Sequence, residues 1–202
     1  MNAGAAIGNL SWLAASLPEL RRFRRDAGRL EDTQRMLLRG YLRRNADTAF
    51  GRQHHFGSIH SFEDFAARVP AASYDAFEPW IGRIAAGEER VLSTDRVRLF
   101  EPTSGSSGPA KLIPYTGKLQ REIRRAVAVW SAGNFLARPD LLLGRAYWSL
   151  TPQIAMSKSP ESLVPVGFDE DSAYLGGTTQ KLISRTLATH PALRRVSDMD
   201  EF

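Results

Sequence analysis

A run of small polar residues between two apolar segments constrains the fold of this chain more than any other feature. The run extends from Thr103 to Lys111 and reads TSGSSGPAK. It contributes little to a hydrophobic core, because it offers almost no apolar side chain to bury. Gly105 and Gly108 allow the backbone to adopt positive φ angles and to approach a ligand closely. These residues therefore predict a loop between two short strands that is suited to binding an anion.

The loop is rich in hydrogen-bond donors. Successive backbone N–H groups can donate to anionic oxygens. The hydroxyls of Thr103, Ser104, Ser106 and Ser107 can do the same, and Lys111 can add a positive charge. A glycine- and serine-rich turn that binds no ligand is the alternative interpretation of the same residues. We favour anion binding, because the loop lies between a predicted strand and a long predicted helix.

Three familiar glycine-rich loops do not fit this run. The P-loop motif ends in Gly-Lys-Ser/Thr, whereas the corresponding positions here are Ala110, Lys111 and Leu112. The dinucleotide-binding motif needs a third glycine beside Gly105 and Gly108. The Gly-x-Ser-x-Gly elbow of serine hydrolases needs one more residue between the two glycines. The sequence therefore supports neither a P-loop phosphotransferase nor a serine hydrolase.

Helices are expected to outnumber strands along the chain. Apolar residues at helical spacing predict a helix over 8–26 and another over 29–45. Pro18 indicates a break or kink in the first of these helices. The further predicted elements are a capped helix from Ser61 to Val69, a helix from Ser73 or Asp75 to Gly87, an extended piece at Val91-Leu92, strands over 97–101, 111–114 and 144–150, and helices over 117–136 and 178–189.

The same apolar spacing predicts which side chains of the longer helices face the core. These side chains are Leu10, Leu13, Leu17 and Leu20 in 8–26, Leu30, Leu37, Leu38, Tyr41 and Leu42 in 29–45, and Ile123, Val127, Trp130 and Phe135 in 117–136. The N-terminal helical region is expected to end at Phe50-Gly51.

The composition is typical of an ordinary globular protein and excludes several kinds of site. Hydrophobic residues make up 43% and charged residues 24% of the 202 residues. No apolar run is long enough to span a membrane. The absence of cysteine excludes disulfides, thiolate zinc sites and cysteine nucleophiles. We therefore expect a cytoplasmic protein without a membrane partner.

The formal net charge is +5, and most of the excess lies in the first fifty residues. The arginines there are interleaved with acidic residues and form no known nucleic-acid-binding motif, so a solvated helix face explains them better than a nucleic-acid partner. The histidines His54 and His55 and the acidic run 169–171 show no recognisable spacing of metal ligands. We therefore expect no protein metal site.

The loop resembles the phosphate-binding loop of the acyl-adenylate-forming superfamily. That loop follows a strand and contains two hydroxyl residues, a glycine, two further hydroxyl residues and a second glycine, with a lysine shortly after. The run from Thr103 to Lys111 matches this order at every such position. Four segments are similar to the N-terminal part of the auxin-responsive GH3 family of acyl acid amido synthetases, with the character of its bacterial members: 74–88, 100–116, 144–152 and 164–177.

This resemblance implies an α/β fold, namely an incomplete N-terminal portion of the large domain of adenylate-forming (luciferase-like) enzymes, rich in helices and with few strands. Residues 1–202 would form that portion, with a helical N-terminal segment over 1–50, a phosphate-loop region over 51–202 and no C-terminal domain. ATP and Mg²⁺ are the implied cofactors. A carboxylic acid and an amino acid are the implied substrates, joined through an acyl-adenylate.

The resemblance also implies roles for the residues of the loop. Lys111 would be the catalytic lysine that counters the phosphate charge, and Thr103 would mainly order the loop. The remaining ATP-binding residues would be Ser104, Gly105, Ser106, Ser107 and Gly108. One of three arginines in the following helix could meet the acid substrate, although solvation explains each of them better: Arg121, Arg124 and Arg125.

Members of the family are several hundred residues long. The chain is therefore expected to be a fragment that is inactive alone, with the missing remainder of the enzyme as its partner. The alternative is a non-catalytic remnant, or a module that binds a nucleotide or another anion without turnover.

Overall fold

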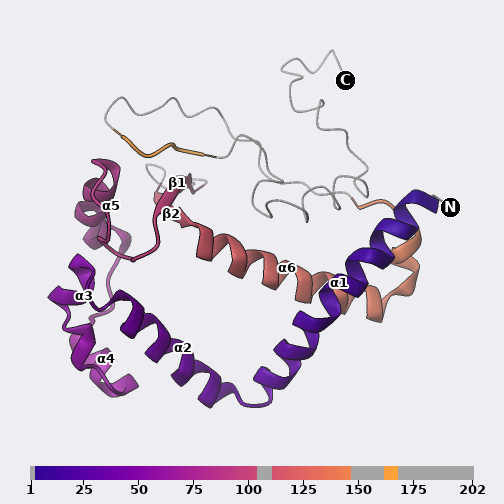
Figure 1. The fold of residues 1–202 in the computed structure, drawn as a ribbon, viewed down its shortest axis with the longest axis horizontal. Helices are drawn as coiled ribbons and strands as arrows, with labels where there is room; N and C mark the ends of the chain where they lie inside the picture. Colours follow the sequence, from indigo (N-terminus) through magenta and orange to yellow (C-terminus); the bar gives the residue numbers. More distant parts are fainter. Residues whose placement is uncertain (1–2, 104–110, 147–161, 168–202) are drawn as a thin grey trace, which may run out of the picture. The chain divides into compact units, whose positions relative to one another are not determined.

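The computed structural model describes residues 3–103, 111–146 and 162–167 of the chain. Within these ranges helices dominate, and one two-stranded sheet is present. The elements are the helices α1 (Ala3–Ala27), α2 (Leu30–Asn45), α3 (Ala49–Gln53), α4 (Phe62–Arg68), α5 (Glu78–Ala85) and α6 (Gly117–Ala137), the short 3₁₀ helices η1 (Phe56–Ser58), η2 (Tyr74–Phe77) and η3 (Pro139–Leu143), and the strands β1 (Val97–Pro102) and β2 (Leu112–Thr116) (Figure 1). This helix-rich arrangement with few strands confirms the predicted fold class.

Contacts within the chain divide it into two compact units. Of the described residues, the first unit holds 3–24 and 120–146, and the second unit holds 25–103, 111–119 and 162–167. The helices α1 and α6 each contribute residues to both units. Both ends of the predicted anion-binding loop belong to the second unit, so that unit carries the candidate site.

The core of the second unit is built around Phe100, whose side chain is fully buried. Ile81, Ile84 and Val91 complete the buried cluster. The N–H of Phe100 donates to the carbonyl of Pro165 at 2.8 Å, and its carbonyl accepts from the N–H of Gly167 at 2.7 Å. Burial of a side chain of this size stabilises the fold by about 1.5–3 kcal/mol. Phe100 therefore joins β1 both to α5 and to the segment 162–167.

The strands β1 and β2 form an antiparallel pair, with Val97 opposite Thr116 and Pro102 opposite Leu112. An irregularity in the register lies between Val97 and Leu99. Both strands confirm the predictions made for this part of the sequence. Because the ladder continues to Pro102 and Leu112, it brings together the two ends of the loop that connects the strands.

Local sequence signals around α5 act as predicted. The short helix η2 and α5 occupy the helix expected to begin at Ser73 or Asp75. Pro79 lies in the first turn of α5, where a missing N–H is tolerated. Gly87 has a φ of 87°, and its N–H donates to the carbonyl of Ile84 at 2.9 Å. Gly87 therefore terminates the helix in the left-handed conformation that glycine adopts without strain.

Two other helix starts are capped by the predicted side chains. The hydroxyl of Ser61 accepts a hydrogen bond from the N–H of Asp64 at 3.0 Å, at the beginning of α4. The hydroxyl of Thr116 accepts one from the N–H of Leu119 at 3.1 Å, at the beginning of α6. These caps confirm the predicted starts of both helices, because each satisfies an N–H group that has no partner within its helix.

The N-terminal helical region does not end at Phe50-Gly51, because α3 runs through both residues. Gly51 packs so closely against the preceding turn that a Cβ atom there would lie 1.9 Å from the carbonyl oxygen of Asn45. Phe50 contacts the rings of four other residues, namely His54, Phe56, Phe77 and Trp80. Its N–H donates to the carbonyl of Val91, which is buried but lies outside the two strands.

In the first unit, α1 buries only one of the four side chains predicted to face the core, that of Leu20. Its buried residues are Ala5, Gly8, Asn9, Trp12, Ser16 and Leu20. Leu10 is 52% exposed, so its predicted burial is wrong. The prediction from the spacing of large apolar residues is wrong here because the buried face consists largely of small and polar side chains. The expected break is also wrong, since α1 continues through Pro18.

The contact between α1 and α6 in this unit includes an edge-to-face pair of Trp12 and Phe135, with ring centroids 6.0 Å apart. Trp130 is 60% exposed, so its predicted burial is wrong as well. Ser131 and Ala132 are the buried residues of α6 instead. Small side chains thus occupy the most buried positions of both helices.

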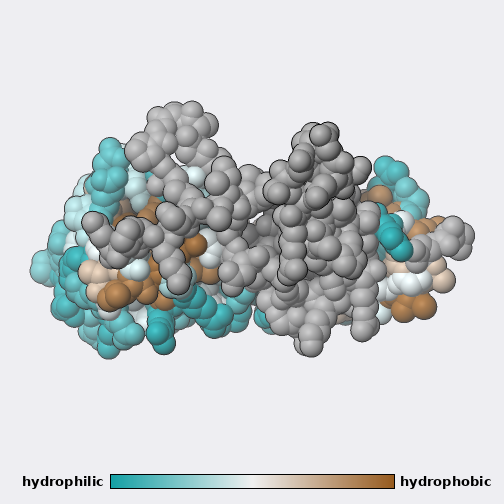
Figure 2. Space-filling view, turned by 90° about the horizontal axis from the view of Figure 1, so that it is seen from above, coloured by the Kyte–Doolittle hydropathy of each residue, from teal (hydrophilic) through white to brown (hydrophobic). Residues whose placement is uncertain are grey.

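The apolar stripe of α2 is largely solvent-exposed. Only Leu42 of this helix is buried, whereas Leu30 is 61% exposed and Leu37 is 48% exposed. The prediction that this stripe faces a core is therefore wrong for most of its length. Figure 2 shows, independently of this helix, patches of hydrophobic residues beside hydrophilic ones on the face that it draws.

The predicted helix over 178–189 and residues 147–150 of the predicted strand over 144–150 lie outside the described residues. Among the described helices, none has the length and apolar character needed to cross a membrane.

Candidate phosphate-binding site

The loop predicted to bind phosphate is closed at its base by a pair of hydrogen bonds between its two end residues. The N–H of Thr103 donates to the carbonyl of Lys111 at 2.9 Å. In return, the N–H of Lys111 donates to the side-chain hydroxyl of Thr103 at 3.2 Å. Both side chains are exposed. The structure therefore gives Thr103 a place at the base of the loop, next to the lysine that closes it.

The predicted phosphate-binding residues between these two ends lie outside the described residues. They are Ser104, Gly105, Ser106, Ser107 and Gly108. Their assignment remains a prediction from the sequence.

The ammonium group of Lys111 lies over the aromatic ring of Tyr74, 5.6 Å from the ring centroid. No carboxylate of the described residues forms an ion pair with Lys111. A cation over an aromatic face is attracted by the negative potential of the ring. The ring itself carries no net charge, so it does not neutralise the ammonium group. Lys111 therefore presents a positive charge at the base of the loop.

The hydroxyl of Tyr74 forms two hydrogen bonds with the main chain of Leu112. It accepts from the N–H of Leu112 at 2.8 Å and donates to the carbonyl of the same residue at 3.2 Å. Leu112 is opposite Pro102 in the ladder. The next pair, Thr103 and Lys111, forms hydrogen bonds across the end of the two strands. The main-chain N–H and carbonyl groups of successive strand residues point to opposite sides of the strand. Those of Leu112 therefore point away from β1, and the hydroxyl of Tyr74 binds both of them.

Sequence reasoning did not single out Tyr74. It lies 38 residues before Leu112, and nothing in its local sequence predicts a contact at that distance. The only signal was indirect, since Tyr74 opens a segment that resembles the same family as the loop. Tertiary packing, rather than sequence spacing, brings this side chain to the base of the loop.

Tyr115 lies in β2, and its environment differs from that of Tyr74 in η2. Its side chain is 2% exposed, and the pKa of its hydroxyl is raised to about 12, mainly by burial. The carboxylate of Glu101 contributes to this increase in the pKa, whereas the guanidinium of Arg98 opposes it. Tyr115 is therefore a neutral, buried residue of the sheet at neutral pH.

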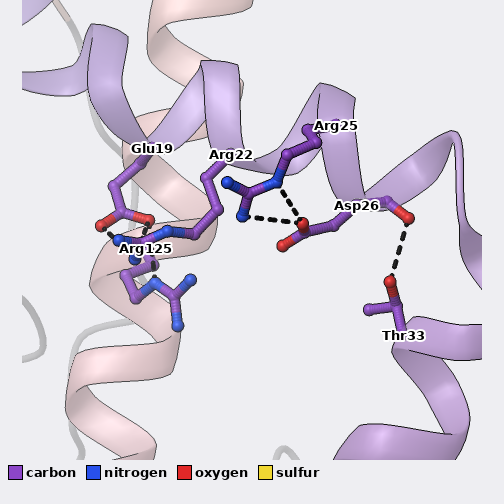
Figure 3. A network of polar contacts seen from close by, with 6 residues as sticks. All are labelled: Glu19, Arg22, Arg25, Asp26, Thr33 and Arg125. Carbon is purple, nitrogen blue, oxygen red and sulfur yellow. Dashed lines mark hydrogen bonds and ion pairs between the residues drawn. The ribbon is translucent and has the colours of Figure 1, made fainter.

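The three arginines of α6 that were considered as contacts for an acid substrate belong to the first unit. All three are exposed. Arg125 forms an ion pair with Glu19 of α1, with a distance of 2.9 Å from Nε to the carboxylate. Glu19 also pairs with Arg22, one turn further along α1 (Figure 3). Arg125 thus has a partner within the first unit, whereas Arg121 and Arg124 remain candidates.

His54 and His55 have structural contacts within the second unit. The Nδ1 atom of His54 lies 2.8 Å from the carbonyl oxygen of Arg68, and its ring packs on that of Phe50. His55 has a φ of 53° and begins the short helix η1. The described residues contain no group of three or more His, Cys, Asp or Glu side chains that could hold a metal ion. The acidic run 169–171 lies outside the described residues.

The sheet, the loop base and the helix that follows belong to a helix-rich fold with one small sheet among the described residues, and comparison with known proteins specifies the family. A family model described as "GH3 family N-terminal domain" matches residues 19–166. This match covers most of the chain and includes the whole loop. The chain belongs to the GH3 family.

Curated relatives carry the same family name. Indole-3-acetic acid-amido synthetase GH3.5 of Arabidopsis thaliana is 33% identical over 103 residues, which are 50% of this chain and 16% of that protein. Putative indole-3-acetic acid-amido synthetase GH3.10 of Oryza sativa subsp. japonica is 36% identical over 173 residues, which are 79% of this chain and 35% of that protein. The chain thus spans between about a sixth and a third of the length of these relatives.

A solved structure has the same fold over the matched part. It is described as "AtGH3.15 acyl acid amido synthetase in complex with 2,4-DB". The TM-score is 0.60 with 22% sequence identity, and the match covers 76% of this chain and 26% of that protein. The described architecture is therefore that of the N-terminal portion of a GH3 acyl acid amido synthetase.

Proposed function

We propose that this chain carries the phosphate-binding part of an ATP-dependent acyl acid amido synthetase. Membership of the GH3 family supports this function, because the curated relatives are named as amido synthetases. The observation that carries the proposal is the loop base, where Thr103 and Lys111 are hydrogen-bonded to each other and the lysine presents an exposed ammonium group. A donor-rich loop that ends in a positive charge suits a polyphosphate ligand.

The proposed reaction has two steps. A carboxylate oxygen of the acid substrate bonds to the α-phosphorus of ATP, and the bond from that phosphorus to pyrophosphate breaks. The amine of an amino acid then bonds to the acyl carbon, the bond from that carbon to AMP breaks, and the amine loses a proton. ATP supplies the leaving group, because AMP leaves a carbonyl carbon far more readily than oxide does.

The residues of this chain serve the first step. Lys111 places its charge next to the triphosphate and neutralises the negative charge that develops on the phosphate oxygens. Ser104, Ser106 and Ser107 donate hydrogen bonds to the same oxygens, and Gly105 allows the backbone to approach them. Mg²⁺ shares the triphosphate charge. We assign it no protein ligand.

The chain alone is proposed not to complete the ligation, since it spans a minor part of the relatives' length. The partner that would complete it is the remainder of the enzyme. The same observation favours a second candidate, a module that binds a nucleotide or another anion without turnover. The proposed location is the cytoplasm.

Two measurements test these proposals. Calorimetric titration with ATP and Mg²⁺ tests nucleotide binding, and Lys111→Ala is expected to lower the affinity about 10- to 100-fold through loss of a charged hydrogen-bonding group. Lys118→Ala is the matched control, because Lys118 lies over the ring of Tyr41 instead of at the loop base. A wild-type chain that binds no ATP would refute the proposed ATP-binding part and a nucleotide-binding module, and would leave only a module for another anion.

ATP–pyrophosphate exchange separates the two candidates. Robust exchange by the chain alone in the presence of a carboxylic acid would contradict the proposal that it is inactive alone. Binding without exchange, with exchange restored by the remainder of a family member, would support an enzyme in parts. Binding that no added partner converts into exchange would favour the binding module.

A further inference from the structure

We propose that Tyr74 is a positioning residue that holds Lys111 in place for its contact with a triphosphate. This inference rests on the proposed function of the loop and adds a residue that lies outside it. Tyr74 contacts the base of the loop in two independent ways, through its hydroxyl and through its ring.

The hydroxyl fixes the backbone that carries the lysine. It binds both the N–H and the carbonyl of Leu112, the residue that directly follows Lys111. On the other side, Lys111 is bound to Thr103 through its own N–H and carbonyl. The main chain of residues 111 and 112 is therefore held from both sides, by Thr103 directly after β1 and by Tyr74 of η2. This arrangement defines the direction in which the side chain of Lys111 leaves the sheet.

The ring restricts the side chain itself. A lysine side chain has four rotatable bonds, and an exposed lysine normally samples many rotamers. With its ammonium group 5.6 Å from the ring centroid of Tyr74, Lys111 is drawn toward one region of space. The contact is weak enough to be exchanged for a phosphate, since cation–π pairs at exposed sites contribute little compared with charged hydrogen bonds.

Tyr74 is itself well anchored. Its side chain is half-buried, and it packs against the buried cluster of the second unit that contains Ile81, Ile84 and Phe100. The position of the ring is therefore set by the core and not by the loop. A rigid support of this kind lowers the ordering cost of binding, because the ammonium group is already restricted before the ligand arrives.

The first test measures the position of the ammonium group in the absence of any nucleotide. Reductive methylation with ¹³C labels the lysines of the chain, namely Lys111, Lys118, Lys158 and Lys181. A methyl group above an aromatic face resonates upfield, so the Lys111 signal is expected upfield in the wild type and in Tyr74→Phe. Tyr74→Leu is expected to return this signal to the position of a free lysine. Lys111→Arg identifies the signal by removing it.

Tyr41→Leu is the matched control for this measurement, because it removes the ring under Lys118 and leaves the ring under Lys111. It is expected to shift the Lys118 signal alone. An unshifted Lys111 signal in the wild type, or a signal that Tyr74→Leu does not change, would overturn the proposed contact whether or not the chain binds ATP.

The second test compares ATP with AMP by calorimetry. Tyr74→Leu is expected to lower the affinity for ATP about two- to tenfold, because binding must then order one long side chain. The affinity for AMP is expected to fall by a smaller factor. Tyr74→Phe, which keeps the ring, is expected to recover part of the loss. A general structural role would instead lower the affinity for both nucleotides equally, because damage to the fold does not distinguish the number of phosphates.

The outcomes separate this inference from the proposed function. Failure of the wild-type chain to bind ATP would refute the function on which the inference rests, and thereby the role of Tyr74. Wild-type binding of ATP that Tyr74→Leu leaves unchanged or strengthens would refute the role of Tyr74 alone. Equal losses of affinity for ATP and AMP would also refute it.

Discussion

The hydroxyl of Thr103 accepts a hydrogen bond from the N–H of Lys111 at 3.2 Å, while the N–H of Thr103 donates to the carbonyl of Lys111 at 2.9 Å. In a regular antiparallel pair a main-chain carbonyl would accept the first of these bonds. The hydroxyl of Thr103 thus extends the ladder by one residue pair with a side-chain acceptor. The base of the loop depends on this side chain.

Thr103→Val is therefore expected to loosen the base of the loop, because valine keeps the shape of threonine but cannot accept the bond from Lys111. Loss of one hydrogen bond at an exposed position should cost about 0.5–1.5 kcal/mol. Calorimetry should show a two- to tenfold lower affinity for ATP. Thr103→Ser keeps the hydroxyl and should bind ATP like the wild type. A serine variant as weak as the valine variant would contradict this explanation.

Phe100→Ala is expected to destabilise the second unit strongly. The side chain is fully buried, and its removal leaves a cavity at the centre of the cluster that joins β1, α5 and the segment 162–167. Loss of such a side chain typically costs about 3–5 kcal/mol. Urea denaturation measures the change. Phe62→Ala, at a position that is 63% exposed, should change the free energy of unfolding by less than about 0.5 kcal/mol.

Asn9→Ala is expected to destabilise the first unit through lost hydrogen bonds. The amide of Asn9 is buried and donates to the carbonyls of Leu142 at 3.0 Å and Gly144 at 2.8 Å. Its loss leaves these carbonyls without that donor, which should cost about 1–3 kcal/mol. Hydrogen exchange of amides in α1 and η3 should report the change.

Ser11→Ala is the control for this variant. The Ser11 hydroxyl is exposed, and among the described residues its hydrogen bond stays within its own helix, to the carbonyl of Ile7. We expect its removal to leave exchange in η3 unchanged. Equal effects of the two substitutions would show that the amide of Asn9 has no special role.

Stability is expected to fall between about pH 10 and pH 12 because of Tyr115. Burial raises the pKa of this hydroxyl to about 12 in the folded chain, whereas an unfolded tyrosine titrates near 10. The folded state therefore binds more protons than the unfolded state in this window, so the free energy of unfolding decreases as the pH rises. The stabilisation is fully present below pH 10 and amounts to about 2–3 kcal/mol at most.

Urea denaturation at a series of pH values, with tyrosine ionisation followed by ultraviolet absorbance, measures this effect. Tyr115→Phe removes the titrating group and should flatten the decrease in stability over the same window. A decrease of the same size in the phenylalanine variant would assign the pH dependence to other groups.

Local sequence signals predicted those elements whose cause is local. The hydroxyls of Ser61 and Thr116 cap their helices, and Gly87 ends α5, because each acts on backbone groups only a few residues away. The strands on both sides of the loop were predicted for a similar reason, since their apolar runs are bounded by turn residues. The loop itself was recognised from the order and spacing of its hydroxyl residues, glycines and lysine.

Burial was predicted less well. Trp130 and Leu10 are exposed, although both lie at positions that apolar spacing assigns to the core. Spacing identifies a face that could be buried, but it does not say which neighbour covers that face. Small and polar residues occupy the buried positions instead: Ser131 is small enough for close packing of helices, and Asn9 forms specific hydrogen bonds there.

The sequence by itself determined the family, the loop from Thr103 to Lys111 and the presence of a lysine at its end, since these depend on residue order alone. Only the tertiary structure brought Tyr74 to Leu112 and to the ammonium group of Lys111, across 38 residues of chain. The physical reason is that the main-chain groups of Leu112 that point away from β1 need a partner, and any residue that the fold places there can supply it. Packing of η2 and α5 on Phe100 decided that this partner is Tyr74.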